Sequence, residues 1–476
     1  MLEPLWTKDE LCAGLDGECS GSIPDAVAGV SIDTRTLAPG ALFFAIKGDR
    51  TDGHAYIDQA FSAGAALAVV SRDFVGKAAG PLLRVSDPLE ALNALGRAGR
   101  VRSAARIVAV TGSVGKTGTK EMLRLMLERL GPTHASDKSY NNHWGVPLSL
   151  ARLSRHAAYA VFEIGMNHAG EITPLTRMVR PHAAIITTVA PVHLEFFTSV
   201  QEIAEAKAEI FHGLESGGTA ILNRDSKHFS FLAARALENG AGKIAGFGKA
   251  PEADARLLGL TEEDWASRID ARIFGAQISY RIGAPGEHLA INSLAALVAV
   301  ETLGGDAVRA AAALAGFYAP AGRGAQSLHT VDGGTLLLLD ESYNANPASM
   351  AAAMKVLGEL PTSKAARRIA VLGDMLELGV SSRDLHRGLE QPIEAARIDG
   401  VFCCGAQMRA LYDALPEPRQ GAWAENSAAL TGTLMAALRA GDAVMIKGSL
   451  GSRMGLLVDA LKQQFPPALQ ERTAAE

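Results

Sequence analysis

The chain has 476 residues, of which 48% are apolar and 20% are charged, ordinary values for a folded globular protein of about three domains. Its formal net charge is −5 and it has no long Lys/Arg block, so nothing in the sequence indicates a nucleic-acid-binding surface. The longest apolar runs are only as long as a strand and the charged N-terminus has no apolar signal core, so we expect a cytoplasmic protein without membrane insertion.

Residues 1–103 are predicted to form a small N-terminal α/β domain. The stretch "GVSIDTRTLAPGALFFAIKG" contains two short apolar strands separated by a turn at Pro39-Gly40. The stretch "AYIDQAFSAGAALAVVSR" is typical of a helix followed by a strand.

Residues 104–320 are predicted to form a second α/β domain. Strands such as "RIVAV", "AYAVFEIG" and "HAAIITTVA" alternate with helices, which predicts a mainly parallel sheet. Residues 250–283 alternate in polarity and predict a hairpin on the rim of this sheet. The apolar stretch "HLAINSLAALVAVETLGG" predicts a helix that closes the domain.

Residues 321–476 are predicted to form a third, Rossmann-like α/β domain. The stretch "GTLLLLDESYNANPASMAAAMKVLGEL" has the pattern of a strand, a loop and a helix. The segments "RRIAVLG", "GVFCCG" and "GDAVMIKG" continue the series as further strands. The predicted fold class is therefore α/β with three domains.

The stretch "VAVTGSVGKTGTKEM" has the strand–turn–helix context of a phosphate-binding loop, although Val110 occupies the usual first glycine position. Backbone amides at the start of the helix can bind phosphate oxygens. We expect Lys116 to reach the β/γ-phosphates and the Thr117 hydroxyl to bind Mg²⁺. The predicted nucleotide-binding residues of the loop are Thr111, Gly112, Ser113, Val114, Gly115, Lys116 and Thr117. The alternative is a glycine-rich turn with a solvated lysine.

Glu163 ends the apolar stretch "AYAVFE", at the edge where open α/β sheets place their ligands. Because Mg²⁺ prefers carboxylate, hydroxyl and phosphate oxygens, Glu163 with Thr117 could complete one metal site. The alternative is a surface ion pair at the end of a strand.

The shortened loop "TGSVGKT" resembles the ATP-binding loop of the Mur ligases and the folylpolyglutamate synthases, which form amide bonds through acyl phosphates. Three further segments carry the resemblance: "SYNNHWGVP", "FEIGMNHAGEI" and "GEHLAINSLAA". It implies that Asn292 meets the adenine. It also implies four residues near the phosphates and the substrate, namely Asn141, Asn142, Asn167 and His168.

The segment "APVHLEFFTSVQEIAEAKAEIF" resembles the part of the Mur ligases that holds a second Mg²⁺. The resemblance implies that His193 is a ligand and that Lys207 is carbamylated by CO₂, which turns a cation into a metal-binding anion. Taken alone, a single His is more often structural and a helical Lys is usually solvated.

The C-terminal segment "RGAQSLHTVDGGTLLLLDESYNANPASM" resembles the D-alanyl-D-alanine-adding branch of the Mur ligase family. The motifs of the tripeptide-forming branch and of the folate branch are absent from the sequence. The resemblance implies that four residues meet the nucleotide, Arg323, Asp340, Glu341 and Tyr343. It assigns Asn344, Asn346, Lys447 and Ser449 to the side of the incoming dipeptide.

The N-terminal segment "SIDTRTLAPGALFFAIKGDRTDGHAYIDQA" resembles the UDP-binding domain of the family. Its polar residues are Thr34, Arg35, Lys47, Asp52 and His54, although turns and helix caps use the same residue types.

The resemblance implies an ATP-dependent ligase with two Mg²⁺ ions that joins D-alanyl-D-alanine to UDP-N-acetylmuramoyl-tripeptide through an acyl phosphate. The catalytic set that it implies is Lys116, Glu163, His193 and Lys207. A ligase that adds diaminopimelate or lysine, or a catalytically silent paralogue that binds the precursor, is the alternative. We expect a monomer.

Overall fold

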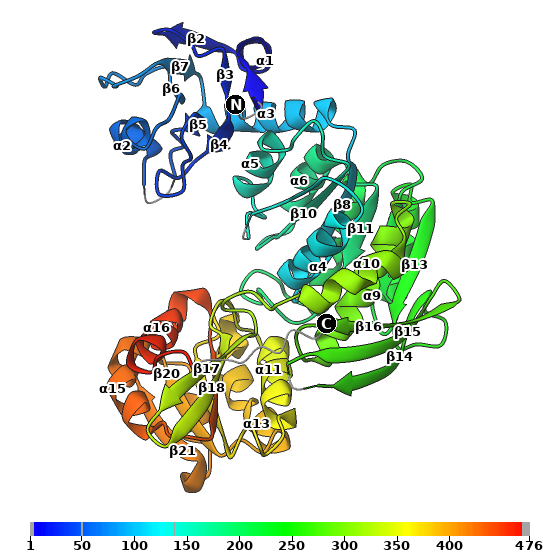
Figure 1. Cartoon of the computed structure of the whole chain (residues 1–476), viewed down its shortest axis with the longest axis vertical. Coiled ribbons are helices and arrows are strands. Elements are labelled where there is room, and N and C mark those ends of the chain that lie inside the picture. The colour runs from blue at the N-terminus through cyan, green and yellow to red at the C-terminus, as the bar shows by residue number, and fades with distance from the viewer. Residues whose placement is uncertain (1–3, 49–50, 138, 264, 469–476) are drawn as a thin grey trace.

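The computed structural model describes residues 4–48, 51–137, 139–263 and 265–468. Three α/β domains follow one another along the chain, and the first and third lie at opposite ends of the molecule with the second beside both (Figure 1). This arrangement confirms the predicted fold class. The exact residues that separate the domains, predicted after 103 and 320, stay a prediction.

The N-terminal domain contains a five-stranded sheet of order β2-β7-β6-β5-β4, in which only the edge strand β2 is antiparallel. A two-stranded sheet of β1 and β3 lies beside it. The strands are β1 Trp6–Thr7, β2 Gly17–Ser20, β3 Ala26–Val27, β4 Gly29–Ser31, β5 Ala41–Phe44, β6 Leu67–Ser71 and β7 Leu82–Val85; the helices are α1 Lys8–Gly14, η1 Gly53–Tyr56, α2 Ile57–Ser62 and α3 Pro88–Arg102.

The central domain contains a nine-stranded sheet of order β16-β15-β14-β13-β12-β11-β8-β10-β9. Its last two strands in the sequence form the predicted hairpin on the rim, β14 adds an antiparallel strand beside them that was not predicted, and the remaining pairings are parallel. The strands are β8 Arg106–Thr111, β9 Thr133–Ala135, β10 Tyr159–Glu163, β11 Ala183–Ile186, β12 Thr219–Asn223, β13 Lys243–Gly248, β14 Ala255–Glu262, β15 Ser267–Ile273 and β16 Ala276–Ile282.

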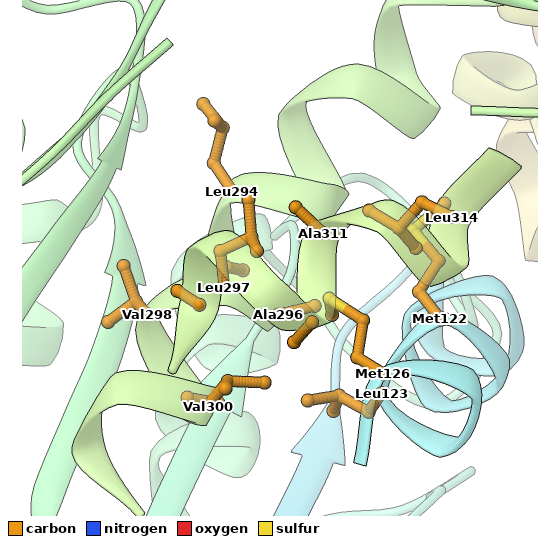
Figure 2. Close-up of a cluster of buried hydrophobic side chains, with 14 of the residues drawn as sticks. Met122, Leu123, Met126, Leu294, Ala296, Leu297, Val298, Val300, Ala311 and Leu314 are labelled. Atoms are coloured by element: carbon orange, nitrogen blue, oxygen red, sulfur yellow. The ribbon is translucent and has the colours of Figure 1, made fainter. Parts of the chain in front are cut away.

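The helices of the central domain are α4 Lys116–Glu128, α5 Gly145–Ala151, α6 Ile172–Val179, α7 Val200–Ala208, η2 Glu209–Gly213, α8 Phe229–Glu238, α9 Glu287–Thr302, α10 Ala307–Ala311 and η3 Ala312–Gly316. Helix α4 packs its Met122, Leu123 and Met126 against α9, α10 and η3 (Figure 2). Helix α9 is apolar on nearly every side, as expected for a helix buried all round. This packing fixes α4, the helix that begins at the predicted phosphate loop.

The C-terminal domain contains a six-stranded sheet of order β17-β18-β22-β19-β20-β21, in which β17 alone is antiparallel. The strands are β17 Ala325–Val331, β18 Gly334–Glu341, β19 Arg367–Gly373, β20 Gly400–Cys404, β21 Gln420–Ala424 and β22 Asp442–Lys447; the helices are α11 Pro347–Glu359, η4 Gly379–Ser381, α12 Ser382–Arg387, α13 Glu390–Ala395, α14 Arg409–Tyr412, η5 Glu417–Arg419, α15 Ser427–Ala437, η6 Leu450–Ser452 and α16 Gly455–Gln464.

Helix α5 ties the central domain to the N-terminal domain. Its Leu148 and Ala151 belong to the apolar cluster that forms the core of the N-terminal domain. The indole Nε1 of Trp6 donates to the Ala151 carbonyl at 2.7 Å, and Arg152 Nε donates to the Val30 carbonyl at 2.7 Å. No helix within the described ranges has the length and apolar character needed to cross a membrane.

Candidate active site

The predicted phosphate loop follows β8 and ends at the first residue of α4. Gly112 and Gly115 have φ values of 147° and 89°, which favour glycine. A Cβ on Gly112 would collide with the side chain of Thr187, and one on Gly115 would collide with Asn292. The two glycines therefore let the loop turn tightly and leave amides at the start of α4 available to an anion.

Contacts to the segment after β11 hold the loop in place. The Ser113 hydroxyl donates to the Ala190 carbonyl at 3.1 Å and accepts from the Ala190 amide at 3.0 Å. The Thr187 hydroxyl donates to the Val114 carbonyl at 2.6 Å. Thr187 and Ala190 follow β11, and the sequence had given neither residue a role in the loop.

Lys116 Nζ lies inside the loop and donates to the Gly112 carbonyl at 2.7 Å. Desolvation is the largest influence on the pKa of this lysine and lowers it, Glu163 acts in the opposite direction, and Arg323 lowers it further. A partly buried ammonium held against one carbonyl is well placed to pair with phosphate oxygens.

Glu163 lies at the end of β10 with 1% of its surface exposed. The Thr117 hydroxyl donates to its Oε2 at 2.8 Å, and the Asn141 amide donates to its Oε1 at 2.7 Å. The structure therefore brings together Thr117, Glu163 and Asn141 as the sequence predicted.

The Thr117–Glu163 pair fits Mg²⁺, which takes one or two carboxylates together with substrate phosphates rather than a cage of protein ligands. No group of three or more His, Cys, Asp or Glu side chains suited to a metal occurs among the residues that the structure describes.

His193 and Lys207, the predicted second metal pair, lie in different surroundings. The His193 ring is held by Glu377 of the C-terminal domain, 2.5 Å from its Nδ1. Lys207 on α7 is 2% exposed. Burial, followed by the nearby charge of Lys116, holds the pKa of Lys207 well below its ordinary value.

A cavity of about 380 Å³ lies between the central and C-terminal domains. Many of the predicted site residues line it, namely Ser113, Val114, Gly115, Lys116, Asn141, Glu163, Asn167, His193, Asn292, Arg323, Glu341, Tyr343, Asn344, Asn346, Lys447 and Ser449. Thr117 lines an adjoining cavity with Arg323 and Tyr343. Residues from several separate segments of the central and C-terminal sequence thus converge on one space.

On the C-terminal side, Arg323 reaches across to the central domain. Its Nη2 donates to the Ser139 hydroxyl at 2.9 Å, and its guanidinium lies 4.1 Å from the centre of the Tyr343 ring. The Lys447 ammonium donates to Glu341 Oε2 at 3.1 Å and to the Asn344 carbonyl at 2.9 Å. These charged groups face the cavity from the side opposite the phosphate loop.

Some predicted residues serve the local backbone. Asp340 accepts from the Gly322 amide at 2.9 Å, and Asn346 caps α11 by accepting from the Ser349 amide at 2.9 Å. Asn142 accepts from the amide of Gly145 at 3.0 Å, at the start of α5. Thr111, Gly112, Asn142, His168, Lys207 and Asp340 are not among the residues that line the 380 Å³ cavity.

The predicted N-terminal residues lie outside this cavity. Asp52 caps η1, and His54 contacts both Asp52 at 2.6 Å and Ser71 at 3.0 Å. Arg35 pairs with Asp33 at 2.6 Å, while Thr34 is partly buried and Lys47 is exposed. A role in holding UDP stays a prediction for all five predicted residues.

Comparison with known proteins covers nearly the whole chain. Residues 26–100 match the family model "Mur ligase family, catalytic domain", residues 110–300 match "Mur ligase middle domain", and residues 326–450 match "Mur ligase, glutamate ligase domain". The UDP-N-acetylmuramoyl-tripeptide--D-alanyl-D-alanine ligase of Escherichia coli is 35% identical over 96% of this chain and 98% of its own length. The enzyme of the same name from Rickettsia prowazekii is 32% identical over 96% and 99%.

Solved structures agree with this result. A crystal structure of MurF from Acinetobacter baumannii has a TM-score of 0.83 and 28% identity, and the match covers 97% of this chain and 99% of that one. MurF from Thermotoga maritima, solved in complex with ADP, shares the fold with a TM-score of 0.76 at 24% identity, over 92% of this chain and 97% of that one. With three matching family models in order and relatives of full length, this chain belongs to the Mur ligase family.

Proposed function

We propose that this chain is an ATP-dependent ligase that joins D-alanyl-D-alanine to UDP-N-acetylmuramoyl-tripeptide. The observation that carries the proposal is the cavity between the central and C-terminal domains. It receives the phosphate loop and Glu163 from one side, and Asn344 and Lys447 from the other. The relatives that match over their full length carry the name of this activity.

The reaction has two steps. The terminal carboxylate of the tripeptide attacks the γ-phosphorus of ATP, and the bond to ADP breaks, which gives an acyl phosphate. The amine of D-alanyl-D-alanine then attacks the acyl carbon, loses a proton, and expels inorganic phosphate through a tetrahedral intermediate. The products are the pentapeptide precursor, ADP and phosphate.

The residues around the cavity have distinct roles in this proposal. The loop from Thr111 to Thr117 binds the phosphates, and Lys116 balances the charge on the group that is transferred. Asn292 meets the adenine. Arg323, Asp340, Glu341 and Tyr343 complete the nucleotide site, while Asn344, Asn346, Lys447 and Ser449 serve the dipeptide.

Thr117 and Glu163 would hold one Mg²⁺, and His193 with a carbamylated Lys207 would hold a second. Such ions neutralise negative charge on the phosphates during the transfer. Two features support the carbamate: Lys207 is buried, and it lies close enough to Lys116 to feel its charge. A neutral amine that attacks CO₂ and releases a proton becomes a carbamate anion, whose charge is opposite to that of the nearby Lys116 ammonium.

At the far end of the substrate, we assign the UDP group to the N-terminal domain, through the segment that contains Thr34, Arg35, Lys47, Asp52 and His54. Asn142, Asn167 and His168 would contact the substrate nearer the phosphates. We also propose that the protein is cytoplasmic and monomeric. Light scattering on the purified protein would test whether it is a monomer.

The test of the activity is substrate dependence. Purified protein should convert ATP to ADP only when UDP-N-acetylmuramoyl-tripeptide and D-alanyl-D-alanine are both present. Equal turnover with the UDP-dipeptide and a free amino acid would instead assign the chain to the preceding ligase. Binding of the UDP-peptide without any ADP formation would identify a silent paralogue.

A further inference from the structure

Lys120 is a fully buried lysine for which the proposed reaction has no use. It lies on α4, one turn after Thr117, and is 0% exposed. Burying an ammonium costs free energy unless its hydrogen-bond donors are matched, and an apolar side chain at such a position is often as stable or more so. The presence of a lysine here therefore calls for a specific contact.

The Lys120 ammonium donates to the Ser136 carbonyl at 2.7 Å and lies 2.9 Å from Oε1 of its neighbour Glu121. Ser136 is itself buried and is the first residue after β9. The contact therefore joins the helix of the phosphate loop to the start of the connection that carries Asn141.

Ser136 contacts the strand that ends at Glu163. Its amide donates to the Val161 carbonyl at 3.0 Å, and its hydroxyl accepts from the Glu163 amide at 3.3 Å. A few residues later, the Asn141 side chain donates to the Glu163 carboxylate at 2.7 Å, and the Asn141 carbonyl accepts from the Gly165 amide at 2.8 Å. The connection from Ser136 to Asn141 thus forms hydrogen bonds with both the carboxylate of Glu163 and the backbone around it.

These contacts form a closed ring. It runs from Lys120 to Ser136, from there to Glu163, across the carboxylate to Thr117, and back along one turn of α4 to Lys120. We infer that Lys120 is a positioning residue for the metal–phosphate site, which holds the Glu163 carboxylate in the orientation that it needs beside the Thr117 hydroxyl. The inference rests on the proposed function, in which these two side chains bind Mg²⁺.

A positioning residue of this kind acts on metal affinity more than on the fold. Groups that orient metal ligands without touching the metal typically change its affinity by about 10- to 100-fold when they are removed. A methionine at position 120 would fill a similar volume without a donor, so the core stays packed while the Ser136 carbonyl loses its ammonium partner.

The experiment is calorimetric titration of ADP into wild type, K120M and R124M, each in EDTA and in Mg²⁺. Arg124 lies on the same helix and pairs with Glu121 at 2.8 Å, so R124M perturbs that carboxylate without touching Ser136. In EDTA all three proteins should bind ADP equally. The gain in affinity from Mg²⁺ should fall about tenfold in K120M and remain in R124M.

A double variant sharpens the result. K120M and N141A act on the same carboxylate, so their effects on the Mg²⁺-dependent gain should be clearly less than additive. The inference is overturned if K120M keeps the full gain, if it loses ADP affinity equally in EDTA and Mg²⁺, or if it does not fold. A wild-type protein whose ADP affinity ignored Mg²⁺ would overturn the metal site itself, and this inference with it.

Discussion

Glu377 of the C-terminal domain lies against His193 of the central domain, with 2.5 Å between its Oε2 and the imidazole Nδ1. Both residues have positive φ values, 63° and 55°, and the Glu377 carbonyl also accepts from the Glu195 amide at 3.1 Å. The hydrogen bond from His193 is the largest influence on the pKa of Glu377, which is lowered. Because a carboxylate accepts, the Nδ1–H of His193 donates and Nε2 is left as the nitrogen that would bind the proposed metal.

We predict that E377A weakens activation by Mg²⁺ about tenfold, because the proposed ligand His193 loses the group that orients its ring. E377Q keeps an acceptor and should lose much less. The Mg²⁺ concentration for half-maximal ADP formation measures the effect. The melting temperature should change little in both variants, since an exposed pair contributes roughly 0–1 kcal/mol. An unchanged Mg²⁺ requirement in E377A would show that the contact only joins the domains.

A glycine of the phosphate loop and a glycine of the helix that follows it should respond oppositely to alanine. Gly115 has φ of 89°, and a Cβ would collide with Asn292, so G115A should abolish ADP binding and cost about 1–2 kcal/mol in stability. Gly118 lies within α4, and a Cβ there meets only Leu289 Cδ2 at 3.8 Å. G118A should therefore bind ADP normally and gain up to about 1 kcal/mol.

Thermal unfolding and ADP titration of the two variants side by side test this contrast. Loss of ADP binding in G118A would indicate that the helix start needs the freedom of a glycine, and a functional G115A would refute the proposed loop geometry.

Replacement of Lys116 should separate activity from stability. Desolvation lowers the pKa of this lysine, so its positive charge destabilises the folded protein when no nucleotide is bound. We expect K116M to melt at the same temperature as wild type or higher, while ADP formation falls by roughly 10²- to 10³-fold. Normal turnover in K116M would disprove the assignment of the loop.

His386 should make the C-terminal domain sensitive to acid. The Met375 amide donates to its Nε2 at 2.9 Å, and its Nδ1 donates to the Ser382 carbonyl at 2.7 Å, so the fold requires a neutral ring. Burial is the largest influence on the pKa of His386 and lowers it, against opposing contributions from Ser382 and Asp374. The unfolded chain then binds more protons, so stability present above about pH 6.5 is lost as the pH falls toward the folded pKa.

The measurement is the drop in melting temperature between about pH 7.5 and pH 5.5. In H386Q an amide can donate and accept at the same site without titrating, so the drop should be smaller than in wild type. H156Q, at an exposed histidine, serves as the control and should behave like wild type. An equal drop in H386Q would place the acid sensitivity elsewhere.

Sequence patterns predicted the parts of the site that are local in the chain. The loop from Thr111 to Thr117 and the position of Glu163 at a strand end follow from strand, turn and helix periodicity, and the structure shows both elements. The hairpin predicted by alternation within residues 250–283 is confirmed by β15 and β16, while the third strand of this rim, β14, was not predicted.

Contacts between distant segments were not predictable in this way. Glu377 lies in "GDMLELG", a stretch that stands out as a motif, but nothing in it indicates which side chain reaches His193, because that depends on how two domains pack. Lys120 looks like an ordinary solvated helical lysine until the fold of the Ser136 connection shows that it is buried. Asn346 is the opposite case. Its cap on α11 is a local contact, and yet its motif suggested only a role in substrate binding.

Helix α5 connects the N-terminal domain to the phosphate-binding part of the central domain. Its Leu148 and Ala151 belong to the core of the N-terminal domain, its Val146 and Leu150 belong to a core of the central domain, and the connection that precedes it carries the Asn141 contact to Glu163. One short helix thus fixes the spacing between the end of the molecule assigned to UDP and the place where the phosphate is transferred. If the nucleotide is anchored as proposed, a precursor peptide one residue too short should hold its carboxylate out of reach of the phosphate loop, whatever its side chains are.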